Sequence, residues 1–86
     1  MIKANIKYDL CEPANGYWNP VQLNFTLSSE SFPLLRMFDK LCGWHETKQY
    51  NKNSIIITCQ YNSQILKLKD LALHLCHLSE DELRRM

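Results

Sequence analysis

Residues 2–27, IKANIKYDLCEPANGYWNPVQLNFTL, decide the fold because they predict two strands joined at a turn. Apolar and polar residues alternate along 2–10 and again along 21–27, which is the period of a strand with one buried face. When the chain is folded about Asn15-Gly16, each apolar residue meets another: Leu10 meets Val21, Tyr8 meets Leu23, Ile6 meets Phe25, and Ala4 meets Leu27. A slip by one residue would break all four pairs. We therefore expect an antiparallel hairpin whose ladder stops near Pro13 and Pro20 and whose loop is 11–20.

A helix is predicted directly after the hairpin. Ser31 and the serines before it offer side-chain oxygens for a helix start, and Pro33 is tolerated in a first turn. Apolar residues then recur on one face: Leu34, Leu35, Phe38, Leu41 and Cys42. The helix should stop at about Cys42, and the polar residues 45–53 predict a loop.

The last third of the chain predicts a strand and two more helices. Residues 54–61 are rich in β-branched residues and indicate a third strand. A second helix begins at Ser63 or Gln64. Ser79 followed by Glu82 is a capping box, so a short third helix should run from Glu80 to Arg85.

This order predicts a single α+β domain over residues 1–86. We expect a two-layer sandwich with a three-stranded, mostly antiparallel sheet (strand-strand-helix-strand-helix) and both main helices on one face. A helical crossover should make the third strand parallel to the second, and the simplest compact sheet then puts the first strand between them.

The composition excludes long-range attraction to polyanions. Ten Lys plus Arg against nine Asp plus Glu leave a net charge of +1. No apolar run approaches the roughly 18 residues of a membrane helix, and the N-terminus does not have the pattern of a signal peptide. Four widely spaced cysteines are unlike a disulfide framework. We expect a soluble, cytoplasmic protein with reduced thiols and no membrane contact.

The predicted topology gathers aromatic residues at one end of the molecule. Loops 11–20 and 43–53 and the end of the second helix should meet there, which would bring together Tyr17, Trp18, Asn19, Trp44, His45, Tyr50 and His77. Trp and Tyr are frequent interface hot spots, so we predict a partner-binding site at this end. The alternative is that Trp18 and Trp44 close the end of a small core.

A second prediction concerns Ile56. In the expected strand order the third strand is an edge, and Ile56 would sit alone on its polar face. Either the C-terminal segment covers this edge, or another chain pairs with it as a homodimer or a partner strand. We favour a partner.

Metal binding and catalysis are weaker alternatives. Cys42 and His45 have C-x-x-H spacing, and Cys76 and His77 could reach the same end to complete a zinc site, but neighbouring residues on a helix point apart. A cysteine nucleophile with a histidine base is possible on paper, but no Gly-rich oxyanion loop is nearby. We expect no cofactor, no metal and no catalytic residues.

Nucleic-acid binding is the main alternative to protein binding. A sheet that stacks bases needs aromatic residues on its open face, whereas Tyr8, Phe25 and Tyr61 are expected to point inward. The leading hypothesis is a small non-catalytic module that docks onto another protein, as an inhibitor, immunity protein, antitoxin or phage-type regulator would. A nucleic-acid-binding regulator is second, and a zinc-binding or cysteine-dependent enzyme is third.

Overall fold

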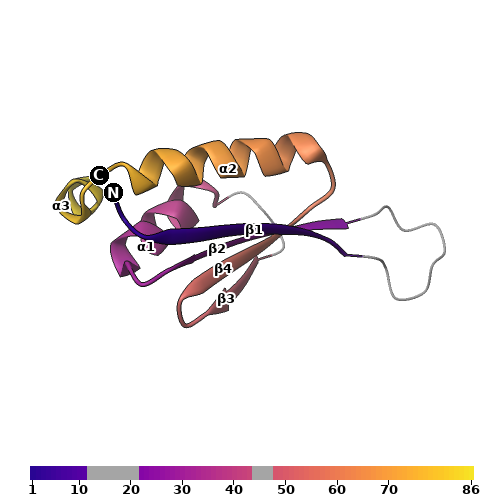
Figure 1. Ribbon diagram of the computed structural model, residues 1–86, viewed down its shortest axis with the longest axis horizontal. Helices are drawn as coiled ribbons and strands as arrows, with labels where there is room; N and C mark the ends of the chain where they lie inside the picture. The colour runs from indigo at the N-terminus through magenta and orange to yellow at the C-terminus, as the bar shows by residue number, and fades with distance from the viewer. Residues whose placement is uncertain (12–21, 44–47) are drawn as a thin grey trace.

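The computed structural model of the protein describes residues 1–11, 22–43 and 48–86. In these residues the elements are β1 (Ala4–Cys11), β2 (Gln22–Ser29), α1 (Phe32–Leu41), β3 (Lys48–Asn51), β4 (Ser54–Cys59), α2 (Asn62–Cys76) and α3 (Glu80–Arg85). The sheet has the order β1-β2-β4-β3, and all neighbouring strands are antiparallel. The predicted α+β sandwich is confirmed, with four strands in place of three (Figure 1).

The buried faces of β2 and β4 lie side by side and form the floor of the core. Phe25 pairs with Ile57 and Leu27 with Ile55, and all four side chains are buried. The main helices α1 and α2 both pack against β2 and β4. Figure 1 shows α2 running along the sheet, and α3 lying beyond the end of the sheet at which β1 begins. Burial of each large apolar side chain here contributes about 1.5–3 kcal/mol.

The hairpin register differs by two residues from the prediction. Tyr8 pairs with Phe25, Ile6 with Leu27, and Ala4 with Ser29. A shift by two residues leaves every side chain on its predicted face, so the alternation could not exclude it. The shift extends β2 to Ser29, whose side-chain oxygen donates a hydrogen bond to the Lys3 carbonyl at 2.8 Å.

The strand β3 is not predicted by the sequence, in which residues 45–53 indicate a loop. It pairs with β4 across a two-residue turn at Lys52 and Asn53. This extra reversal makes β4 antiparallel to β2, so the prediction that this strand runs parallel to the second strand is wrong. The strand β1 consequently lies at one edge of the sheet, and the prediction that it lies at the centre is also wrong.

Helix starts follow the predicted caps closely. The Ser31 side chain accepts a hydrogen bond from the Leu34 N–H. The capping box of Ser79 and Glu82 is present, and α3 has the expected bounds, Glu80–Arg85. None of the helices in the described part of the chain is long and apolar enough to cross a membrane.

Four side chains depart from their predicted burial. Tyr8 is exposed although it lies in line with the inner face, because β1 is an edge strand. Tyr61 is exposed because β4 ends at Cys59, which makes Tyr61 the N-cap of α2. On α1, Met37 is buried while Leu41 is exposed.

Candidate functional site

Most residues of the predicted aromatic end lie outside the described residues. These are Tyr17, Trp18, Asn19, Trp44 and His45. Tyr50 is described: it lies on β3, its side chain is exposed, and its hydroxyl donates a hydrogen bond to Asp39 Oδ1 on α1 at 2.8 Å. The role of the other aromatic residues in binding stays a prediction.

The structure places His77 away from the end at which β1 stops. The backbone N–H of Ile2 donates to the Cys76 carbonyl at 2.9 Å, so α2 ends where the chain enters β1. The prediction that His77 joins the end carrying the 11–20 loop is therefore wrong. The cause is the direction of β4, which runs antiparallel to β2. The helix α2 therefore starts at the end of the sheet where β1 stops, and it ends where β1 begins.

Ile56 lies on an interior strand. It pairs with Thr26 of β2 on one side and with Gln49 of β3 on the other. The prediction of an edge at 54–61 is wrong, because the unexpected β3 covers that edge. Another chain therefore cannot pair along this strand, and the structure does not support a homodimer through Ile56.

The cysteines of the conceivable zinc site do not come together. Cys76 lies beside Ile2, at the end of the sheet where α1 begins, whereas Cys42 is the C-cap at the other end of α1. Among residues 1–11, 22–43 and 48–86, no group of three or more His, Cys, Asp or Glu residues could hold a metal ion. Burial raises the pKa of the Cys59 and Cys76 thiols, which keeps both thiols protonated.

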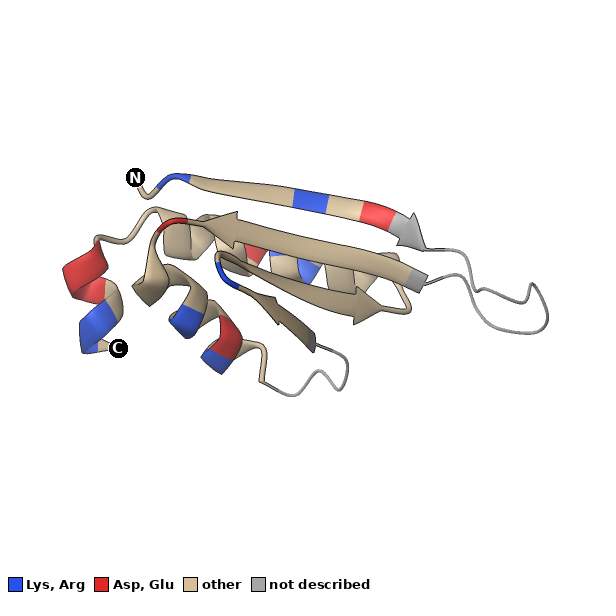
Figure 2. Ribbon diagram, turned by 90° about the horizontal axis from the view of Figure 1, so that it is seen from below, with Lys and Arg blue, Asp and Glu red and all other residues tan. Residues whose placement is uncertain are grey.

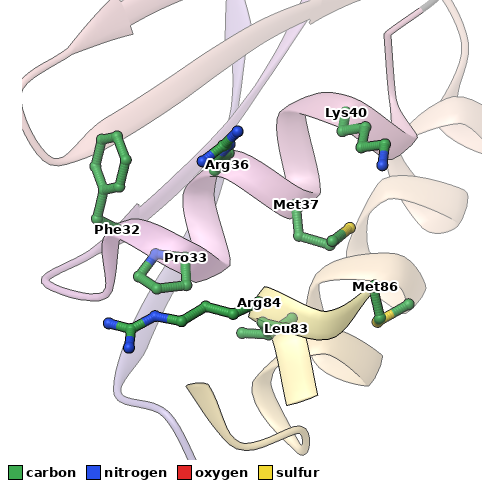
Figure 3. Close-up of a pocket in the computed structure, with 8 residues that line it drawn as sticks. All are labelled: Phe32, Pro33, Arg36, Met37, Lys40, Leu83, Arg84 and Met86. Atoms are coloured by element: carbon green, nitrogen blue, oxygen red, sulfur yellow. The ribbon is translucent and has the colours of Figure 1, made fainter. Parts of the chain in front are cut away.

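Two hollows lie side by side along the outer surface of α1. The larger, of about 450 Å³, lies between α1 and α3 and is called the α1–α3 groove below (Figure 3). The smaller, of about 250 Å³, lies between α1 and β3 and includes Tyr50. Phe32 and Arg36 line both hollows. We call the two hollows and the helix face between them the α1 surface.

Helical spacing explains why these side chains point outward. Phe32, Arg36 and Lys40 follow one another at intervals of four residues, which places them in one row along α1. The opposite side of the helix buries Leu34 and Phe38 against the sheet. Phe32 remains 71 % exposed, although it is a large aromatic side chain.

The helix α3 forms the second wall of the α1–α3 groove. Its capping box fixes its start, and Leu83 anchors it with only 2 % of its side chain exposed. Arg84 and Met86 then border the groove. Figure 3 shows Arg84 extending from α3 toward the start of α1, where Pro33 lies. Figure 2 shows the acidic first turn of α3 and its basic end.

A binding site on the α1 surface was not predicted from the sequence, although the sequence contains part of the pattern that indicates it. The four-residue spacing of Phe32, Arg36 and Lys40 indicates an outward row of one aromatic and two basic residues. The position of α3 beside α1 depends on the tertiary packing of Leu83, which no local pattern reveals.

Comparisons with known proteins identified no relative of this chain. No family model matches the chain, and neither a curated protein nor a solved structure matches it.

Proposed function

We propose that this protein is a non-catalytic module that binds another protein through the α1 surface. An inhibitor, immunity protein, antitoxin or phage-type regulator would act in this way. We place the interaction in the cytoplasm, where four widely spaced cysteines would stay reduced.

The exposed ring of Phe32 carries the proposal. It stands between two hollows, so a partner that covers it also fills concave surface on both sides. Large aromatic side chains in such a setting are typical interface anchors. Transfer of the ring from water into an interface would contribute about 1.5–3 kcal/mol.

Polar groups around Phe32 support docking in a fixed orientation. Arg36 reaches both hollows, and Tyr50 is held by its hydrogen bond to Asp39. Tyr and Arg are enriched at interfaces because each combines a large contact surface with hydrogen-bonding groups.

Affinity capture from cells that express the protein tests this proposal. The wild type is compared with Phe32→Ser and with the matched control Leu66→Ser, which removes a 60 % exposed apolar side chain from α2. We expect a protein that is captured by the wild type and by Leu66→Ser, and lost with Phe32→Ser. Equal capture by all three forms contradicts the proposal.

Two additional arms separate the competing functions. Nuclease treatment before capture distinguishes protein binding from the nucleic-acid alternative, because a contact through RNA or DNA is lost and a direct one persists. The variants Trp18→Ala and Trp44→Ala test the aromatic end predicted from the sequence. Loss of capture with these variants and not with Phe32→Ser would move the binding site away from the α1 surface.

A further inference from the structure

The floor of the α1–α3 groove is apolar and belongs to two helices. Met37 and Leu83 are buried at its base, with 7 % and 2 % of their side chains exposed. Met86 and Phe32 line it with exposed apolar surface. Methionine side chains adapt to different partners and are common in grooves that accept peptide segments.

The charged side chains at the rim of the groove are all basic. Arg36 and Lys40 come from α1 and Arg84 from α3, so three of the ten basic residues of the chain gather at one hollow. No Asp or Glu residue lines the groove within the described part of the chain. In that same part of the chain, none of the three cations forms an ion pair.

The carboxylates nearest to the groove do not line it. Asp39 of α1 lines the neighbouring hollow together with Arg36, and it accepts a hydrogen bond from the Tyr50 hydroxyl. Glu82 accepts a hydrogen bond from the Ser79 backbone N–H as part of the capping box. Glu80 and Asp81 lie in the first turn of α3, and neither lines the groove. The groove therefore has an excess of basic side chains over acidic ones, in a molecule whose net charge is only +1.

We propose that the α1–α3 groove binds an acidic, amphipathic segment of the partner protein. Apolar side chains of that segment pack on Met37 and Met86, and its carboxylates lie near Arg36, Lys40 and Arg84. This inference rests on the proposed function and adds to it the chemistry of the partner. The groove runs beside an α1 of 10 residues, a length of about 15 Å, which suits a few turns of helix or a short extended segment.

The combination of floor and rim favours a peptide over other anions. A nucleic acid would meet the basic rim but would leave the methionines without apolar partners. A lipid surface is broad and needs a protruding contact, whereas this site is concave and lies between two helices. A peptide supplies apolar side chains and carboxylates within one turn of helix.

Peptide display tests the inference directly, because the selection itself reveals which sequences the groove accepts. Random peptides of about 12 residues, some three turns of helix, are selected on the immobilised wild-type protein. Selected peptides are then measured by fluorescence anisotropy against Arg36→Glu/Arg84→Glu and against the control Lys3→Glu/Lys67→Glu. The control makes the same change in net charge at exposed sites outside the groove.

We expect the selected peptides to combine Asp or Glu with apolar residues. Their affinity should fall about tenfold or more in the groove variant and about twofold or less in the control. It should also weaken as salt rises from about 0.05 to about 0.3 M, since exposed charges are screened. The neutral variant Arg36→Gln/Arg84→Gln should also bind the peptides less tightly, with a smaller loss of affinity. It replaces the reversed-charge variant if that form fails to fold.

Three outcomes overturn the inference. The first is that no peptide is selected or that the selected peptides show no acidic excess, and the second is equal binding to the groove variant and the control. The third is that a single-stranded oligonucleotide or vesicles of phosphatidylglycerol bind more tightly than the peptides and depend on Arg36 and Arg84. If Phe32-dependent capture persists in any of these cases, the proposed function stands and only the assignment of the groove fails.

Discussion

Phe25 illustrates, for a single residue, how local pattern and tertiary packing combine. Its side chain is fully buried on β2, and its ring stacks on that of Phe38 of α1, with ring centroids 5.8 Å apart. Alternation along 21–27 predicts that Phe25 points inward. The stacking partner could not be predicted, because it depends on where α1 crosses the sheet.

Replacing Phe25 with Ala should strongly destabilise the protein. Loss of the ring and the cavity left behind should lower the free energy of unfolding by about 3–5 kcal/mol. The matched change Phe32→Ala, on an exposed ring, should alter it by about 0.5 kcal/mol or less. Urea denaturation measures both, and similar losses for the two variants would show that the core is not centred on Phe25.

The buried thiols make stability depend on pH in the alkaline range. Burial raises the pKa of Cys59 and Cys76 above the ordinary value of 9.0. As the pH rises through that value, the unfolded chain loses thiol protons that the native protein keeps. The unfolded state then binds fewer protons, so the free energy of unfolding falls as pH rises.

Urea midpoints at about pH 8 and about pH 10 test this effect, because the first lies below and the second above the ordinary pKa of a thiol. The wild type should be less stable at the higher pH. The double variant Cys59→Ala/Cys76→Ala should start from a lower stability and lose less of it over the same range. An equal loss in both proteins would assign the pH dependence to other groups.

Among the elements, Ser29 joins three parts of the fold. Its hydroxyl donates to the Lys3 carbonyl before β1 and accepts from the Ser31 N–H, at 2.8 and 3.0 Å, before α1 begins. The bond to Lys3 depends on the two-residue shift in register, because that shift pairs Ser29 with Ala4. The alternation of apolar residues carries no information about the pairing of a serine, so it could not predict the bond between Ser29 and Lys3.

Ser29→Ala should leave a buried N–H and a carbonyl without their partner. The free energy of unfolding should fall by about 1–3 kcal/mol. Ser63→Ala removes an exposed hydroxyl from the first turn of α2 and should change it by about 0.5 kcal/mol or less. Thermal unfolding followed by circular dichroism compares the two, and a neutral Ser29→Ala would contradict the role given to this hydroxyl.

Elements with a local signal were predictable, and β3 was not. The capping box of Ser79 and Glu82 placed α3 at its observed bounds, since the signal lies within four residues. Residues 48–51, KQYN, contain one aromatic and no apolar alternation. They form a strand because β4 offers an unpaired edge and a two-residue turn brings them back along it.

For the whole molecule, the direction of β4 determines which residues can act together. The hairpin of β3 and β4 adds one reversal of the chain, which reverses β4 and with it α2. His77 consequently lies near the start of β1, and Ile56 lies inside the sheet. The fold class followed from the sequence of elements, whereas the placement of candidate site residues needed the strand order.

The α1 surface is likewise a property of the assembled molecule. Phe32, Arg36 and Lys40 are set by α1 alone, but the groove exists only because Leu83 holds α3 beside that helix. The aromatic and basic residues act as one surface because α3 supplies Arg84 and Met86 from the far end of the chain.

Mapping a bound partner onto the protein shows directly whether it binds at the α1 surface. The partner identified by affinity capture is titrated into ¹⁵N-labelled protein, and shifts of the backbone amide signals are followed by NMR. We expect the largest changes in Phe32–Leu41 and Glu80–Arg85, with the α1–α3 groove between them. Changes confined to the free edge of β1 or to the outer side of α2, around Leu66 and Leu73, would contradict binding at the α1 surface.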